Sequence, residues 1–271
     1  MADIKNLHVA PPLVRDPISH VTVDIIIPFH GQADKMINLV RSIYSTTKTP
    51  QYQMCVVDDC SPNENISQSF AKAPRMKYIR TPKHIGFGGA VDMGIKSTEN
   101  SWICVLHSDC LVVQPKWLEE LLRTMGKLRD KRVMMVSART NNPGEGTPLK
   151  LKANRGAVDD DFILEEGFLP MYCCLMHRQM FRMLGSYIKT YPYAMYEDEE
   201  LAARMKHKGL RQAISGKSWV EHAGSATINW LCEKQTLANY QGPDYRSIME
   251  ANYERCLSDI AQLGASELPR R

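Results

Sequence analysis

The first half of the chain alternates between two hydrophobic patterns. Val21–Phe29 is a run rich in β-branched residues, which is typical of a strand buried on both faces. Apolar residues at helical spacing follow in Asp34–Ser45. The same reasoning predicts strands at Met54–Val57, Met76–Ile79, Trp102–Leu106 and Val133–Ser137, and helices at Glu64–Ala71, Phe87–Ser97 and after Pro115. Strands that alternate with helices predict an α/β fold, with a mostly parallel sheet flanked by helices.

This alternation stops between Arg139 and Asp161. Asparagine, proline and glycine dominate there, and together they predict a long flexible loop. The second half then resumes with predicted strands at Phe168–His177 and Trp219–His222, and helices ending at Leu184 and spanning Glu197–Lys208 and Tyr245–Leu263. The 271 residues are enough for one large or two small domains.

Composition and charge are those of an ordinary soluble protein. Apolar residues make up 44% of the chain, and 34 basic residues against 30 acidic ones give a net charge of +4 that is spread along the sequence. This small, even charge does not favour nucleic-acid binding. No apolar run approaches the ~20 residues that span a bilayer, so we expect no transmembrane segment, although peripheral contact with a membrane is compatible with the sequence.

The cysteines indicate a reducing compartment. None of the eight belongs to a CxxC pair, and Cys55, Cys104, Cys173 and Cys174 lie within apolar stretches. A free cysteine in such a stretch behaves as a small hydrophobic residue. We therefore expect reduced thiols and a cytoplasmic protein.

Three predicted strands end in polar residues that could take part in binding or catalysis. These ends are Pro28-Phe29-His30, Asp58-Asp59 and Ser108-Asp109. In open α/β sheets, ligands bind at the carboxyl ends of the strands. The Asp58-Asp59 pair fits either a capped turn or a carboxylate that accepts the imide N–H of a uracil or thymine ring. Asp109 fits a divalent cation that bridges a diphosphate, because such a cation needs only one or two carboxylates.

Two later motifs have both a structural and a functional interpretation. Glu197–Glu200 is either an acidic first turn favoured by the helix dipole or a group of carboxylates that raise one another's pKa, which suits a general base. Tyr191, Tyr193 and Tyr196 just upstream suit a sugar-stacking surface. His222 ends a predicted strand, where it is either a packed polar residue or a ligand.

Taken in order, these motifs resemble the inverting glycosyltransferases of family 2, which have the GT-A fold. The resemblance extends from about Val23 to Thr227. The matching stretches are Asp24–His30, Val56–Ser61 (the family's VDDGS), Gly86, Ala90 and Gly94 (NxGxxxAxNxG), Leu106–Asp109 (the end of DxD), Tyr196–Gly209 (EDxDLxxRxxxxG) and His222–Ser225. The chain departs from the family at His107 (the first Asp of DxD), His84 and Asp92 (asparagines) and Cys60 (a glycine).

The resemblance implies roles for individual residues. Asp198 would be the catalytic base, while Asp109 and His222 would bind a divalent metal, Mn²⁺ or Mg²⁺. Tyr196, Glu197 and Arg204 would support the base and the acceptor. The donor-binding residues would be Pro28, Phe29, His30, Asp58, Asp59, Gly86, Ser108 and Asp109.

The predicted function is therefore sugar transfer from a nucleotide sugar to a hydroxyl group of a glycan or other acceptor, with inversion and metal assistance. We expect a UDP or dTDP donor from Asp58. The expected parts are an N-terminal extension (1–20), a nucleotide-sugar-binding half (21–138), a flexible loop (139–161), an acceptor-binding and catalytic half (162–228) and a helical tail (229–271). Two alternatives stay open: a non-catalytic sugar-nucleotide-binding module, and a nucleotidyltransferase of similar fold.

Overall fold

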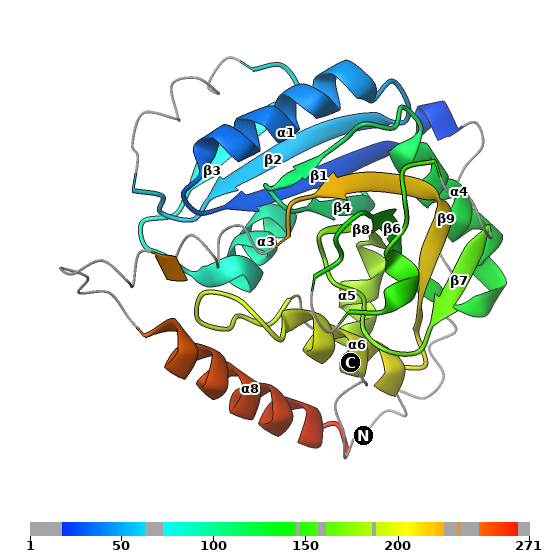
Figure 1. Ribbon diagram of the computed structural model, residues 1–271. Coiled ribbons are helices and arrows are strands. Elements are labelled where there is room, and N and C mark those ends of the chain that lie inside the picture. The colour runs from blue at the N-terminus through cyan, green and yellow to red at the C-terminus, as the bar shows by residue number, and fades with distance from the viewer. Residues whose placement is uncertain are drawn as a thin grey trace.

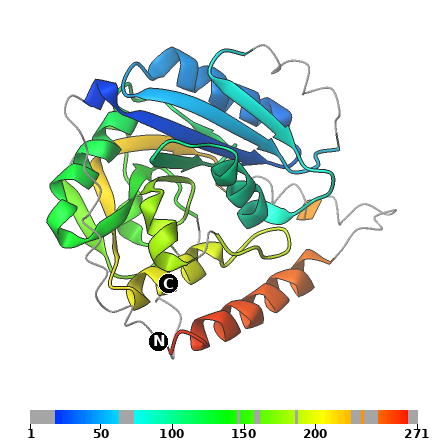
Figure 2. The same ribbon diagram turned by 180° about the vertical axis from the view of Figure 1, so that it is seen from behind.

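Strand β1 (Thr22–Phe29) lies inside the sheet, between the parallel strands β2 (Gln51–Asp58) and β4 (Trp102–Leu106). Strand β3 (Met76–Arg80) continues the parallel part beyond β2. Helices α1 (Ala33–Thr46) and α3 (Gly86–Lys96) lie on opposite sides of these strands (Figures 1 and 2). Because both faces are covered, consecutive residues such as Ile25, Ile26 and Ile27 are all fully buried.

The second half of the sheet is mixed. Strand β8 (Cys173–His177) pairs antiparallel with β4 and with β6 (Val133–Thr140), and β6 pairs in parallel with β9 (Arg211–His222). The short strands β5 (Cys110–Leu111) and β7 (Phe162–Glu165) both pair antiparallel with β9. The order is β3-β2-β1-β4-β8-β6-β9-β5, with β7 beside β9.

Four more α-helices lie in the part of the chain that the structure describes. They are α4 (Trp117–Lys127), α5 (Gln179–Leu184), α6 (Glu197–His207) and α8 (Tyr245–Ala261). Helix α4 packs on β6 and β9, whereas α8 packs on α6. Figures 1 and 2 both show α8 outside the sheet layers, beside the coil that leads into α6.

The computed structural model describes residues 18–62, 73–144, 147–156, 161–185, 188–224, 232–233 and 244–264. The helix predicted at Glu64–Ala71 and most of the N-terminal extension lie outside these residues. Within them, no helix is both long enough and apolar enough to cross a membrane.

Several predicted elements have different bounds in the structure. The strand expected at Phe168–His177 begins only at Cys173, since Pro170 has no N–H to donate to a neighbouring strand. The strand expected at Trp219–His222 extends back to Arg211. The expected loop begins after Thr140 rather than at Arg139, because both residues are buried in β6 as its partners in β9 continue alongside.

All eight cysteines fall within the described residues, and all are free thiols. Six are buried, among them the four predicted to be so, while Cys60 and Cys232 are half-buried. Burial raises the pKa of Cys55 to about 11 and that of Cys256 to about 12. The buried thiols therefore act as small apolar groups.

A glycine fixes how closely α3 approaches β1. A Cβ atom added at Gly94 would lie 2.4 Å from Cγ2 of Ile26, which is fully buried. We expect Gly94→Ala to lower the free energy of unfolding by about 1–3 kcal/mol, as overpacking in a dense core does. Urea denaturation measures this change.

Gly89→Ala is the matched control on the same helix. The three atoms nearest to its added Cβ all belong to the Ile85 side chain, at 3.2–3.3 Å, and alanine is the better helix former. Equal stability of the Gly94→Ala variant and the wild type would contradict the close packing.

Candidate active site

A cavity of about 820 Å³ opens at the carboxyl ends of β1, β2 and β4 and extends to α6 and α8. Of the thirteen residues predicted for the site, ten line this cavity: Pro28, Phe29, His30, Asp59, Ser108, Asp109, Tyr196, Glu197, Asp198 and His222. Asp58, Gly86 and Arg204 do not. The fold therefore brings the two predicted halves of the site together around one space.

Three side chains at one side of the cavity could hold a metal ion. Ligand atoms of His107, Asp109 and His222 all lie within 4.8 Å of one another. The pairing of β5 with β9 creates this cluster, because it sets Cys110 opposite His222. The backbone N–H of Ala223 also donates to the Asp109 carbonyl oxygen at 3.1 Å.

Two asparagines orient His222. Its Nδ1 lies 2.7 Å from the carbonyl oxygen of Asn142, which can only accept a hydrogen bond. A proton therefore sits on Nδ1, and Nε2 is directed toward Asp109, with its Oδ1 at 3.2 Å. The Asn141 side chain forms two hydrogen bonds with the backbone of His222: it accepts from the N–H at 2.9 Å and donates to the carbonyl oxygen at 3.2 Å.

His107 is a neutral imidazole at ordinary pH. Burial, with the neighbouring His222 ring, lowers the pKa of His107 to about 4. A neutral ring has a lone pair for a metal, which a protonated ring lacks. The sequence suggested that His107 interrupts the metal motif, whereas the structure places it among the candidate ligands.

Helix α6 begins with two carboxylates at the cavity. Atoms Oε1 of Glu197 and Oδ1 of Asp198 are buried and have no hydrogen-bond partner among the described residues. Burial, together with Glu199 and Glu197, raises the pKa of Asp198 well above its usual value. Burial also raises the pKa of Glu197 to about 8. The expected rise in pKa is present, but burial is its main cause and the neighbouring charges come second.

Arg204 acts one turn away from the cavity. Its Nε donates to both carboxylate oxygens of Glu200, at 2.7 and 2.9 Å, and both side chains are buried. This i,i+4 pair supports the first turns of α6.

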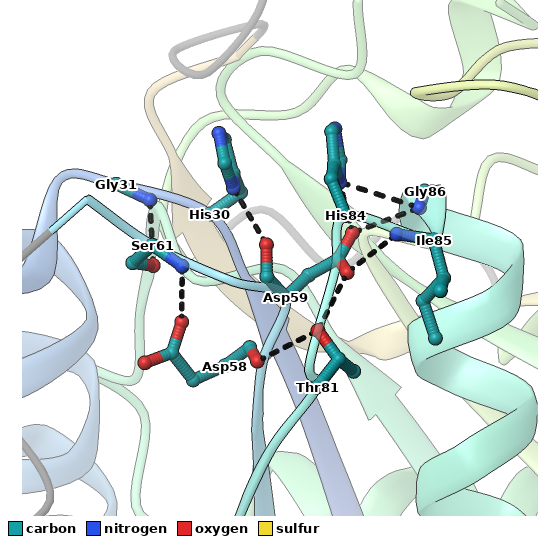
Figure 3. Close-up of polar contacts among 9 residues, drawn as sticks. All are labelled: His30, Gly31, Asp58, Asp59, Ser61, Thr81, His84, Ile85 and Gly86. Atoms are coloured by element: carbon teal, nitrogen blue, oxygen red, sulfur yellow. Dashed lines mark hydrogen bonds and ion pairs between the residues drawn. The ribbon is translucent and has the colours of Figure 1, made fainter. Parts of the chain in front are cut away.

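The two adjacent aspartates at the end of β2 have different surroundings. The side chain of Asp58 points away from that of Asp59 (Figure 3). Asp58 is fully buried and accepts hydrogen bonds from Tyr78, Arg80 and the Ser61 N–H. It does not line the cavity, so it gives no support to a uracil or thymine contact.

Asp59 lines the cavity, and its carboxylate is fully engaged. Oδ1 accepts hydrogen bonds from the Thr81 hydroxyl at 3.1 Å and the Ile85 N–H at 2.8 Å, while Oδ2 accepts from the Gly86 N–H at 2.8 Å and from His84 (Figure 3). Gly86 thus contributes through its N–H to Asp59. These four hydrogen bonds fix the start of α3 and the residues before it relative to the end of β2.

Sequence reasoning did not identify the row of rings along the cavity wall. His30 stacks on His84 with ring centroids 4.3 Å apart. The edge-to-face contacts of His84 with Tyr193 at 4.5 Å and of Tyr193 with Tyr245 at 4.9 Å continue the row. All four residues line the cavity. His84 could have been noticed as a departure from the family pattern, but Tyr245 has no signal in the sequence.

The chain matches the model of the family described as "Glycosyl transferase family 2" over residues 24–185, more than half of its length. It belongs to this family. The O-antigen biosynthesis protein RfbC of Myxococcus xanthus is 23% identical over 230 residues, which cover 76% of this chain and 17% of RfbC. The chain thus spans about one sixth of this curated relative.

Solved structures share the fold. Residues 1–349 of S. aureus TarS in complex with UDP-GlcNAc give a TM-score of 0.57 at 13% identity, covering 88% of this chain and 73% of that one. The mannosyltransferase PcManGT of Pyrobaculum calidifontis with GDP-Man and Mn²⁺ gives 0.59 at 13% identity, covering 93% and 76%. This glycosyltransferase family 2 chain therefore has the expected GT-A fold.

The surroundings of Asp58 lead to a stability prediction. Burial opposes its ionisation, but hydrogen bonds from Tyr78, Ser61 and Arg80 hold its pKa below the ordinary value. A lowered folded-state pKa stabilises the protein above the unfolded-state pKa of about 3.9, and this contribution is lost as the pH falls through the folded-state value.

We therefore expect Asp58→Asn to lower the free energy of unfolding by roughly 2–3 kcal/mol at pH 7, with the difference from wild type shrinking below about pH 4. Urea denaturation at several pH values measures both. A difference that does not change with pH would argue against the ionised, hydrogen-bonded carboxylate.

Proposed function

We propose that this chain is an inverting glycosyltransferase that moves a sugar from a nucleoside-diphosphate sugar to an acceptor hydroxyl. One observation carries the proposal: Asp198, whose buried Oδ1 has no hydrogen-bond partner among the described residues, lines the same cavity as His107, Asp109 and His222. A proton acceptor and a cation site in one cavity are what displacement of a diphosphate by a hydroxyl group needs.

Asp198 is the general base. Its carboxylate takes the acceptor's hydroxyl proton as the acceptor oxygen forms a bond to the anomeric carbon. The bond from that carbon to the diphosphate breaks at the same time, and the electron pair leaves with the diphosphate. Attack opposite the leaving group inverts the configuration. Burial of Asp198 raises its pKa, which makes the carboxylate a stronger base than an exposed aspartate.

His107, Asp109 and His222 would hold a divalent cation. The chemistry of this set fits, because it combines one carboxylate with two imidazoles, of which His107 is kept neutral by its lowered pKa and His222 presents Nε2. Such a cation, when bound, supplies positive charge to the leaving diphosphate. When the donor is bound, His30 and His84 would lie beside its nucleoside, and Ser108 would lie near its diphosphate.

The proposal gives only the chemical class of the donor and of the acceptor. A uridine or thymidine donor remains our expectation, but Asp58 no longer supports it. TarS and PcManGT were solved with UDP-GlcNAc and GDP-Man respectively, so donors with different bases occur on this fold. Hydrolysis of a panel of nucleotide sugars, with and without Mn²⁺, tests the function. Donor binding without turnover would favour the binding module instead.

The ligand set leads to a prediction about the metal. Imidazole suits transition metals, whereas Mg²⁺ prefers oxygen ligands. We expect Mn²⁺ to support more activity than Mg²⁺, and Asp109→Asn to weaken Mn²⁺ binding at least about tenfold, the lower end of what changes around metal ligands cost. Calorimetry with Mn²⁺ alone measures the affinity.

His107→Asp is the informative partner variant, because it restores the carboxylate that the family motif has at this position. It should shift the Mn²⁺-to-Mg²⁺ activity ratio toward Mg²⁺. Unchanged Mn²⁺ affinity in Asp109→Asn, or an unchanged ratio in His107→Asp, would remove this cluster as the metal site.

The base assignment leads to a second prediction. Asp198→Asn keeps the shape of the side chain but removes the proton acceptor, so kcat should fall by roughly 10²–10⁴, while the donor Kd should hardly change. Glu197→Gln should cost much less, because the proposal gives the role of proton acceptor to Asp198 and not to Glu197. Full activity of Asp198→Asn would disprove the assignment.

A further inference from the structure

The segment that leads into α6 has an unusual backbone. Three of its residues, Tyr193, Met195 and Tyr196, have φ angles of 65°, 88° and 76°. This left-handed region is disfavoured for residues other than glycine because Cβ approaches the carbonyl oxygen. Such a conformation persists only where the surrounding contacts hold it. Glu197 and Asp198 follow directly, so the shape of this segment determines where both carboxylates lie.

On one side, the segment lies against the first turn of α3. The N–H of Phe87 donates to the carbonyl oxygen of Tyr193 at 2.7 Å. Gly86 permits this approach, since a Cβ there would lie 2.6 Å from the carbonyl oxygen of Tyr191. The same Gly86 donates its N–H to Asp59. The donor side of the cavity thus fixes one edge of the segment.

On the other side, Asn252 of α8 holds the segment. Its Nδ2 donates to the carbonyl oxygens of Pro192 at 2.8 Å and Ala194 at 2.9 Å. Asn252 is only 2% exposed. The two acceptors flank Tyr193, the first of the left-handed residues. One amide group therefore holds the Pro192–Tyr193 and Ala194–Met195 peptide units.

Further contacts keep α8 in place along this segment. Sγ of Cys256 lies 3.7 Å from the carbonyl oxygen of Tyr196. Asp259 accepts hydrogen bonds from Tyr191 at 2.9 Å and from Lys189 at 3.2 Å. Figure 1 shows α8 running beside the coil before α6. The match to the family model ends at residue 185, so both the segment and the residues of α8 that contact it lie beyond the matched region.

We propose that Asn252 is a positioning residue for the catalytic base: its amide group holds the left-handed segment in shape and thereby sets the place of Asp198 in the cavity. This inference rests on the proposed function. Asn252 touches neither the cavity nor the cation cluster. It should therefore affect turnover while leaving metal binding unchanged.

Asn252→Asp tests the proposal in the full-length chain. Aspartate has the same shape, but it has no hydrogen to donate when ionised and only one when protonated, so it cannot bond both carbonyl groups as the amide does. We expect faster amide hydrogen exchange in the peptide covering residues 191–200, a kcat at least about tenfold lower, and a Mn²⁺ affinity within about twofold of wild type. Asn252→Gln keeps both amide hydrogens and should recover part of the exchange protection and of kcat.

Glu254→Gln is the matched control, since Glu254 is exposed on the same helix and should behave as wild type. Unchanged exchange in residues 191–200, or unchanged kcat despite faster exchange, would overturn the positioning role. Loss of Mn²⁺ binding together with kcat in both Asn252 variants would also overturn it, since it would indicate a general loss of structure. If wild type turns over no nucleotide sugar, the proposed function fails, while the exchange measurement still decides whether Asn252 holds the segment.

Discussion

The carboxylate of Asp59 fixes the geometry from which the candidate site is built. Its four hydrogen bonds join the end of β2 to Thr81, to His84 and to the N–H groups at the start of α3. Because α3 in turn donates to the segment before α6, a displacement at Asp59 would be passed on toward Asp198. Asp59 thus helps to set the spacing of the two halves of the cavity through α3, although its four partners all belong to the first half. Replacing Asp59 by asparagine would change one of its two oxygens into an NH₂ group. The two donors that face this atom would then lose their acceptor.

Much of the fold could be predicted from the sequence, because the parallel half has both faces covered and its strands are continuously apolar. The predicted β4 coincides with the observed one, and β1 and α6 differ by one residue at an end. The strands β5 and β7 were missed. Each is short, and each forms only because β9 offers it an edge, a long-range pairing that local periodicity does not reveal. The extension of β9 back to Arg211 was missed because Gly216 and Lys217 interrupt its apolar pattern.

The candidate site was predictable in outline but not in detail. Strand ends identified Asp109 and His222, and the structure brings them together. Asp58 and Asp59 belong to the same motif, and the choice between them depends on a shift of one residue along the strand, since neighbouring side chains point to opposite sides. The orienting contacts from Asn141 and Asn142 to His222 join residues about eighty positions apart. Neither these contacts nor the row of rings ending at Tyr245 follows from any local pattern.

The distribution of the cysteines offers a practical handle. Six thiols are buried, while Cys60 and Cys232 are half-buried, so a thiol-reactive fluorophore or spin label should discriminate kinetically between the two groups. Cys60 directly follows Asp59, which lines the cavity. With Cys232 replaced by serine, a probe on the native Cys60 would sit next to the place where a nucleotide should bind. Spectroscopic titration of ligands would then need no engineered attachment point, and the strand cysteines that pack the core could stay as they are.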